Sequence, residues 1–246
     1  MKYFVTGGSR GIGAAIVVEA ARAGHDVAFT YVRDEAAAIA VATQCRALAP
    51  TRTFKAYRLD VRSSAEVEAV GDRVLEDFGS IEVVVANAGI NHNNLVVSMS
   101  DEEWRSVVET NLFGAFYVAR YFLPAFLAQR FGRIILMASL GTTGVSGQAN
   151  YAASKAGLLG LSATLAKEYG RKGITSNVVS PGFFETDMTR AGMSEGNRAF
   201  WLAHNPLGRL GELPELAKLI GFLASPGADY INGQEIRVDG GLGWAP

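Results

Sequence analysis

The sequence predicts an α/β protein, a single-domain Rossmann fold over residues 1–246 with a doubly wound parallel sheet of about seven strands and helices on both faces. Short apolar runs alternate along the chain with longer segments of helical periodicity. Several of these runs are continuously apolar, which is typical of parallel strands covered on both faces. Because no Ser/Gly-rich or highly charged linker divides the chain, one domain is expected.

The individual elements follow from these patterns. The expected strands contain Tyr3–Val5, Val27–Phe29, Phe54–Leu59, Ile81–Ala86 and Ile134–Ala138, and a later one ends at Ser180. The expected helices are Ile12–Ala23, Glu35–Leu48, Ala65–Phe78, Asp101–Gln129 in one or two pieces, Ala152–Gly170 and Glu212–Leu223. Residues 182–206 break this rhythm, and a long insertion after the carboxyl end of a strand is often a substrate lid.

Composition excludes several classes of protein. Lys plus Arg number 23 and Asp plus Glu 24, so the net charge of −1 gives no reason to expect nucleic acid as the main ligand. The single cysteine, Cys45, rules out a disulfide within the chain. We expect no signal peptide, no membrane span and no metal site, and therefore a cytoplasmic protein.

A glycine-rich segment follows the first expected strand and leads directly into a helix. It reads Thr6-Gly7-Gly8-Ser9-Arg10-Gly11-Ile12-Gly13. Glycines permit a tight turn and close approach of backbone N–H groups, and the helix N-terminus favours negative charge. The segment predicts a pyrophosphate site of a dinucleotide, with a turn that binds nothing as the alternative.

The end of the second strand bears on the choice of dinucleotide. An acidic residue there is typical of NAD binding, but the chain reads Thr30-Tyr31-Val32-Arg33, and Asp34 falls where a helix cap is expected. Arg33, flanked by Arg10, favours a 2′-phosphate and hence NADPH/NADP+. The alternative is that both arginines are merely solvated.

A tyrosine and a lysine four residues apart are the candidate chemical groups. Tyr151 and Lys155 share one face of a helix, where an ammonium can lower the pKa of a phenol. Ser139 stands at the carboxyl end of an apolar run, where it could bind a substrate carbonyl oxygen. Asn111 lies within a helical pattern that asparagine disfavours, which indicates either a buried polar site or a simple helix contact.

Together these motifs resemble the short-chain dehydrogenase/reductase family over essentially the whole chain. The matching segments are TGGSRGIG (6–13), LDV (59–61), NAG (87–89), Asn111, Ser139, YAASK (151–155) and Pro181-Gly182. Within the family, DEEWRSVVETNL (101–112), GQANYAASKAGL (147–158), NVVSPGFFETDM (177–188) and YINGQEIRVDGG (230–241) are similar to 3-oxoacyl-[acyl-carrier-protein] reductases.

The resemblance implies a catalytic tetrad of Asn111, Ser139, Tyr151 and Lys155. Tyr151 protonates the carbonyl oxygen while NADPH delivers hydride, and Ser139 orients the substrate. Lys155 binds the nicotinamide ribose and lowers the Tyr151 pKa, and Asn111 holds a water that resupplies the proton. The implied cofactor contacts are Gly7, Ser9, Arg10, Gly11, Ile12, Gly13, Arg33, Asp60, Val61, Asn87, Ala88, Gly89, Tyr151, Lys155, Pro181, Gly182, Phe184 and Thr186, with Asp60 and Val61 facing adenine, Asn87 on the adenosine side and Thr186 contacting the carboxamide.

The resemblance also implies partners. Arg130 and Lys172 match positions that dock acidic acyl carrier protein near the mouth of the site, although two solvated charges are the alternative. The family is usually tetrameric through its two long central helices and its C-terminal region. Small residues at Ala152, Ala156, Gly157 and Gly160 agree with close helix approach.

Other interpretations remain open. The same fold and chemistry could serve a sugar, an alcohol or a xenobiotic carbonyl, or the chain could be a cofactor-binding regulator without catalysis. His92 follows the NAG motif, where it could touch substrate or be solvated. The aromatic character of the lid suits a long, flat or unsaturated acyl chain, or else reflects packing of the lid; it comes from Phe183, Phe184, Met188, Phe200 and Trp201.

Overall fold

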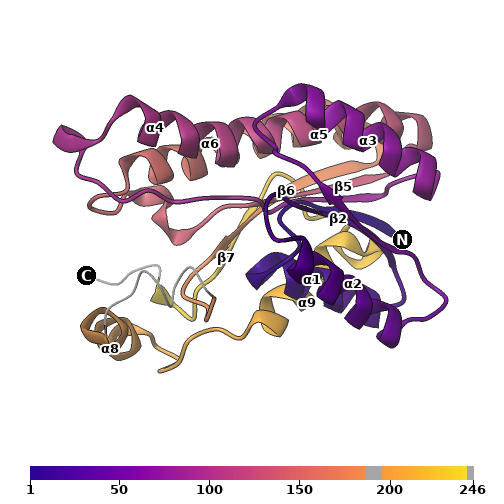
Figure 1. Ribbon diagram of the computed structural model, residues 1–246. Helices are drawn as coiled ribbons and strands as arrows, with labels where there is room; N and C mark the ends of the chain where they lie inside the picture. The colour runs from indigo at the N-terminus through magenta and orange to yellow at the C-terminus, as the bar shows by residue number, and fades with distance from the viewer. Residues whose placement is uncertain (187–194, 243–246) are drawn as a thin grey trace.

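The computed structural model describes residues 1–186 and 195–242 and shows a three-layer α/β architecture (Figure 1). Its sheet has seven strands in the order β3-β2-β1-β4-β5-β6-β7, and every neighbouring pair is parallel. The strands are β1 (Lys2–Val5), β2 (Asp26–Tyr31), β3 (Phe54–Arg58), β4 (Val83–Ala86), β5 (Gly132–Met137), β6 (Ile174–Pro181) and β7 (Glu235–Val238). The predicted doubly wound fold is confirmed.

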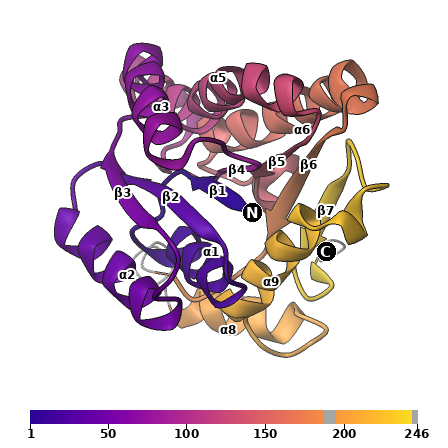
Figure 2. The ribbon, with the colours of Figure 1, turned by 90° about the vertical axis from the view of Figure 1, so that its right-hand side faces the viewer.

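Helices cover both faces of this sheet (Figure 2). One face carries α3 (Ser64–Phe78), α5 (Gly114–Gln129) and α6 (Ala149–Tyr169), with α4 (Asp101–Val108) leading into α5. The other face carries α1 (Gly11–Arg22), α2 (Glu35–Leu48) and α9 (Leu213–Ala224), with α8 (Glu195–His204) beyond the carboxyl edge. Each face has its own apolar core.

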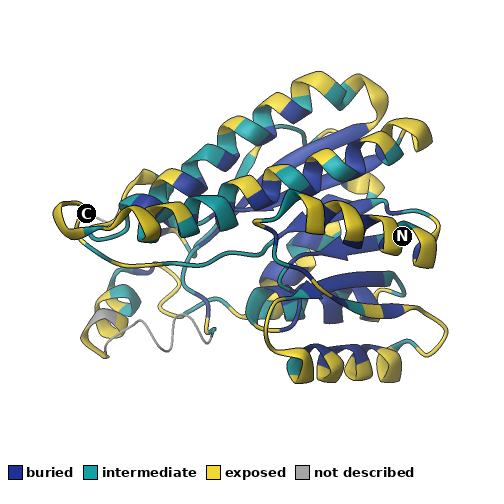
Figure 3. Ribbon diagram, turned by 45° about the horizontal axis from the view of Figure 1, so that its top comes forward, coloured by how far each residue is buried: buried dark blue, intermediate teal, exposed yellow. Residues whose placement is uncertain are grey.

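Strands β1, β2, β4, β5 and β6 are mostly buried and are drawn in dark blue in Figure 3, as the apolar runs predict. Both faces of β5 and β6 are buried along their whole length, so even the polar side chains of these strands lie inside the protein. Parallel strands sandwiched between helices lose contact with water on both sides. This burial explains why the strands read as apolar runs rather than as alternating patterns.

Helix ends follow local sequence signals. The Ser63 side chain accepts a hydrogen bond from Glu66 N at 3.2 Å at the start of α3, and Gly79 ends that helix with a φ of 74°. Asp34 caps α2, where its carboxylate accepts from Ala37 N at 2.9 Å. The predicted bounds of α2 are confirmed at both ends.

Other boundaries differ from the prediction in ways that matter for the site. The predicted helix Asp101–Gln129 is continuous but contains a π-helical turn, Glu109–Phe113, between α4 and α5. The predicted helix Ala152–Gly170 begins three residues earlier, at Ala149, so Tyr151 lies in its first turn. Helix ends depend on capping contacts from distant segments, which periodicity does not report.

The predicted lid is only partly described. The predicted lid contains α8, while residues 187–194, including Met188, lie outside the described residues. Its role as a lid remains a prediction.

Within the ranges that the structure describes, no helix has the length and apolar character needed to cross a bilayer.

Candidate active site at the carboxyl edge of the sheet

The glycine segment forms a tight loop between β1 and α1. Gly7 and Gly11 have φ angles of 65° and 54°, a conformation that other residues rarely adopt. A Cβ on Gly13 would lie 2.1 Å from the Gly7 oxygen, so α1 approaches the loop too closely for any side chain there. Arg10 precedes α1 without a side-chain capping bond, which leaves the first N–H groups of this helix available to an anion.

Asn87 joins this loop to the neighbouring strand β4. Its side-chain Nδ2 donates to the backbone oxygens of Thr6 at 2.9 Å and Gly7 at 3.2 Å. In return, the Thr6 hydroxyl accepts from the backbone N–H groups of Asn87 and Ala88, both at 3.0 Å. These bonds lie where the strand order reverses between β1 and β4, which is where open parallel sheets bind ligands.

Acidic residues on the adenosine side are already engaged. Asp34 caps α2, and the Asp60 carboxylate pairs with Arg62, with a 2.6 Å contact to Nη2. Hydrogen bonds from Arg62 hold the pKa of Asp60 below its usual value. Arg33 and Arg10 are both exposed at this edge. Asp34 and Asp60 are therefore both engaged within the protein, while Arg10 and Arg33 are exposed.

Asn111 lies inside the protein because the π-helical turn carries it there. It is 1% exposed, and its Oδ1 accepts from Ile90 N at 2.8 Å. Its Nδ2 donates to Ile90 O and to the Ser154 hydroxyl, both at 3.0 Å. A Cβ built on Gly89 would lie 3.2 Å from Asn111 Oδ1 and 3.3 Å from Lys155 Nζ, so the loop after β4 brings these two side chains together.

Tyr151 projects from the first turn of α6 toward the end of β5. Burial raises the pKa of Tyr151, and a hydrogen bond from Ser139 lowers it in part. In this structure burial of the phenol outweighs the hydrogen bond from Ser139. The expectation that Lys155 lowers the Tyr151 pKa stays a prediction. Lys155 Nζ lies 5.7 Å from the centre of the Tyr151 ring and donates instead to Met137 O at 2.7 Å.

Lys155 is an almost completely enclosed cation. It is 4% exposed, and burial lowers its pKa to about 8. A buried ammonium with one carbonyl partner is costly, and such groups concentrate at functional sites. Ser139, Tyr151, Lys155 and Asn111 therefore form one group of proton-exchanging and hydrogen-bonding side chains at the same edge as the glycine loop.

Comparisons with known proteins agree with this arrangement. Residues 7–243 match a family model described as enoyl-(acyl carrier protein) reductase. The chain belongs to the short-chain dehydrogenase/reductase family. It is therefore an oxidoreductase of a family that uses a nicotinamide cofactor.

Several curated relatives carry the name 3-oxoacyl-[acyl-carrier-protein] reductase FabG. The Escherichia coli (strain K12) protein is 45% identical over 97% of this chain and 95% of its own length. The Staphylococcus epidermidis (strain RP62A) protein is 42% identical over 97% of both. Among solved structures, levodione reductase superposes with a TM-score of 0.95 at 33% identity, covering 100% of this chain and 98% of its own.

The remaining predicted cofactor contacts follow strand β6, and Phe184 differs from the others in being packed into the core. A Cβ on Gly11 would come within 3.8 Å of the Thr186 side chain, so Thr186 faces the glycine loop across the site. Pro181 ends β6, and Gly182 N donates to Val238 O at 2.9 Å. Phe184 is 3% exposed and packs against Gly211, so its ring belongs to the core and leaves little side-chain surface for a ligand.

Arg130 and Lys172 do not lie near the mouth of the site in the same chain, contrary to the expectation. Arg130 ends α5 just before β5, and Lys172 just precedes β6, so both sit at the amino edge of the sheet. Tyr151 begins α6 and Lys172 follows its end, and a helix of 21 residues separates them by about 30 Å. Helix direction, which a motif match does not convey, places them at opposite ends.

Sequence reasoning missed Ser154. Its hydroxyl accepts from Asn111 Nδ2 and donates to Tyr151 O at 2.7 Å, which links the π-helical turn to α6. A serine one position before the lysine carries no signal by itself, since it also suits an exposed helix face. Three aromatic residues of the predicted lid lie in contact: the Phe183 and Trp201 rings are 4.5 Å apart and tilted, and Phe200 meets Trp201 edge-on. His92 is exposed.

The buried ammonium predicts a specific pH dependence of stability. The Lys155 pKa is about 8 in the folded protein and 10.5 in its unperturbed form, so the unfolded chain binds more protons between these values. Lys155 should therefore contribute a rise in stability of ~2 kcal/mol between pH 7 and pH 9.5, while Cys45, whose pKa burial raises to about 11, contributes a smaller fall. In Lys155→Met this rise should disappear, as measured by urea unfolding at both pH values. An equal rise in both proteins would contradict the assignment.

Proposed function

We propose that this chain reduces 3-oxoacyl groups, carried as thioesters on acyl carrier protein, to the 3-hydroxyacyl form with NADPH, in fatty acid synthesis or a related specialised acyl or polyketide pathway. The observation that carries the proposal is the Ser139–Tyr151–Lys155 group, with its buried lysine, beside a glycine loop whose shape suits pyrophosphate. The names of the relatives support the substrate class. A cytoplasmic setting suits this work.

The residues of the glycine loop fit a dinucleotide. Gly7, Gly11 and Gly13 leave a cradle that a Cβ would fill or strain, and the first N–H groups of α1 face it. Ser9, Ile12, Val61, Ala88 and Gly89 complete the proposed lining, with Thr186 opposite. NADPH, when bound, supplies hydride to the carbonyl carbon.

The side chains then perform the acid chemistry. Ser139 orients the substrate oxygen by a hydrogen bond, and Tyr151, whose raised pKa keeps the phenol protonated, donates its proton to that oxygen. Lys155 has a pKa of about 8 and can exchange a proton at Nζ near neutral pH. Asn111 fixes the loop beside Lys155 by its hydrogen bond to Ile90. In the proposed mechanism it also holds the water that resupplies the proton through Lys155.

Two alternatives have specific support. A different small carbonyl substrate is favoured by the similarity to levodione reductase, and reduction of an enoyl thioester by the description of the family model. A regulator without catalysis is disfavoured, because a sensor has no need of a buried Tyr/Lys/Ser/Asn group.

A substrate panel tests the proposal. We expect NADPH oxidation with 3-oxoacyl thioesters and much slower reaction with enoyl thioesters or levodione-like ketones, followed at 340 nm. Tyr151→Phe should lower kcat by at least ~10²-fold because the proton donor is lost. Absence of turnover with every 3-oxoacyl thioester, carrier-bound or free, would refute the assignment. Variation of chain length and unsaturation tests the role of the aromatic lid.

Cofactor choice provides a separate test. Arg33→Ala should raise the KM for NADPH by ~10-fold or more while leaving that for NADH within twofold, since a charge-assisted bond to the 2′-phosphate is lost. Arg46→Ala, at the other end of α2, is the matched control and should change neither. Equal losses for both cofactors would contradict the phosphate role of Arg33.

We infer that carrier docking requires a second copy of the chain. An antiparallel pairing of α5 and α6 about a two-fold axis sets the amino edge of one copy beside the carboxyl edge of the other. The α4–α5 surface offers exposed apolar side chains for such contact, namely Trp104, Phe113, Phe116 and Leu127. Arg130 and Lys172 would then dock an acidic carrier that serves the partner's site, within a tetramer.

Kinetics with two substrate forms tests this docking. Replacing both Arg130 and Lys172 with Ala should raise the KM for a carrier-bound substrate by ~10-fold at low salt and leave that for the free thioester unchanged. An Arg22→Ala/Arg46→Ala double variant, which removes two cations from the other face, controls for net charge. Unchanged KM for carrier-bound substrate would instead favour a substrate that needs no carrier.

A further inference from the structure

Asn150, the residue before the proposed acid, is completely buried and fully hydrogen-bonded. Its side-chain Nδ2 donates to the backbone oxygens of His92 at 3.1 Å and Glu103 at 3.0 Å. Its Oδ1 accepts from the backbone N–H of Tyr151 at 2.7 Å. One amide thus joins three segments: the loop after β4, helix α4 and the first turn of α6.

The first turn of α6 depends on this amide. Helix N-termini leave N–H groups without partners in the helix, and a capping side chain usually accepts from one of them. Gln148 precedes α6 and makes no side-chain capping bond. Asn150 Oδ1 takes over this task for the N–H of Tyr151, at the helix end from which the phenol projects.

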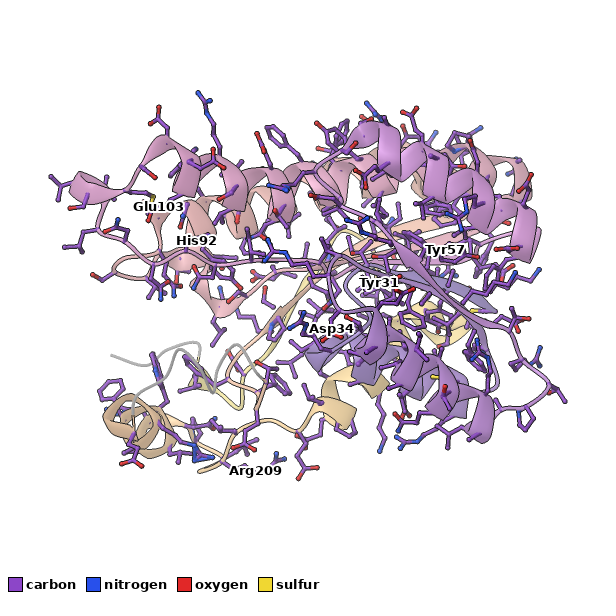
Figure 4. The ribbon with its side chains drawn as sticks, viewed as in Figure 1. Tyr31, Asp34, Tyr57, His92, Glu103 and Arg209 are labelled. Atoms are coloured by element: carbon purple, nitrogen blue, oxygen red, sulfur yellow. The ribbon has the colours of Figure 1, made fainter. Side chains whose placement is uncertain are left out.

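The loop on the other side of the amide is held by several bonds. Asn111 binds both the N–H and the oxygen of Ile90, and Asn94 N donates to Gly147 O at 2.9 Å. Asn94 Nδ2 also donates to the Glu103 carboxylate at 3.3 Å. In Figure 4, His92 and Glu103 lie close together at the end where α4 begins. Asn150 connects this loop directly to the backbone of Tyr151.

We propose that Asn150 is a positioning residue that holds Tyr151 and the loop of residues 90–94 in one arrangement, so that the phenol meets the substrate carbonyl in the reactive geometry. This rests on the proposed role of Tyr151. Only a primary amide presents two N–H donors and an acceptor on so short a side chain. A carboxylate lacks the donors, and a hydroxyl supplies only one.

Alanine substitution tests the positioning role. Asn150→Ala should lower kcat by ~30- to 100-fold, because a displacement near 1 Å at the reacting group has effects of this size. Binding of NADPH, measured by fluorescence, should stay within twofold because the glycine loop is not contacted by Asn150.

The matched control is Asn177→Ala. Asn177 is 1% exposed, and its side chain donates to Ile231 O at 2.8 Å and accepts from Gln234 N at 3.1 Å, between β6 and the C-terminal region. Loss of a buried amide destabilises both variants, but only Asn150→Ala should lose kcat. A loss of kcat in Asn150→Ala of less than threefold, or an equal loss in both variants, overturns the proposal.

A second variant separates positioning from folding. Asn150→Asp keeps the acceptor for Tyr151 N, and while protonated its carboxyl can donate to one of the two carbonyls. When the introduced carboxyl ionises, its negative charge repels the backbone oxygens of His92 and Glu103. The ratio of its kcat to that of the wild type should therefore fall as pH rises through the pKa of the introduced carboxyl. A parallel pH profile of the two proteins overturns the proposal.

Hydrogen exchange supplies a readout independent of turnover. The Tyr151 amide should exchange at least ~10-fold faster in Asn150→Ala than in the wild type, while amides in the middle of α6 stay protected. Unchanged exchange at Tyr151 overturns the proposal. If the wild type reduces no thioester, the proposed function fails, but the exchange result still decides the positioning of Tyr151.

Discussion

The site depends on the separation of two parallel strands at the carboxyl edge of the sheet. Strands β1 and β4 are neighbours, yet the chain leaves them toward opposite faces, which opens a crevice between their ends. Four hydrogen bonds bridge that crevice, and all of them are donated by Asn87 and Ala88 to oxygen atoms of Thr6 and Gly7. The glycine loop and the loop after β4 are thereby held in a fixed relation, and each supplies one half of the site.

The catalytic half is stabilised by buried polar bonds rather than by apolar packing alone. Polar groups removed from water must find partners, so a network of this kind admits few alternative arrangements. Asn111 donates to Ser154, and Ser154 donates to a backbone oxygen of α6. Asn150 donates to a backbone oxygen of α4. Lys155 is the exception, since a single carbonyl partner leaves its charge poorly compensated and its pKa low. The protein thus contains a destabilising charge at the position proposed for proton exchange.

Helix direction divides the molecule into two functional edges. Helices that follow parallel strands all run back toward the amino edge, so residues at the two ends of α6 cannot serve one small site. The proposed chemistry occupies one edge and the basic residues Arg130 and Lys172 the other. In the docking proposed above, a carrier protein would contact two copies of the chain, and oligomer formation would then have a direct role in substrate delivery.

The sequence by itself determined the fold class and the order of strands and helices along the chain, and it supplied the residues proposed for the site. Continuous apolar runs report burial on both faces, and Gly7, Gly11, Tyr151 and Lys155 stand at spacings that local backbone geometry already makes meaningful. Such signals act over a few residues, so they can be read along the chain.

Only the tertiary structure decided the hydrogen-bond partners and the burial of the site residues. Asn111 bonds to Ser154, 43 residues away, and Asn150 bonds to the backbone oxygen of Glu103, 47 residues away. The raised pKa of Tyr151 comes from enclosure of the phenol. The placement of Arg130 and Lys172 far from Tyr151 follows from helix length and direction. Hydrogen bonding and burial depend on what surrounds a residue in space, and a linear pattern carries no record of those neighbours.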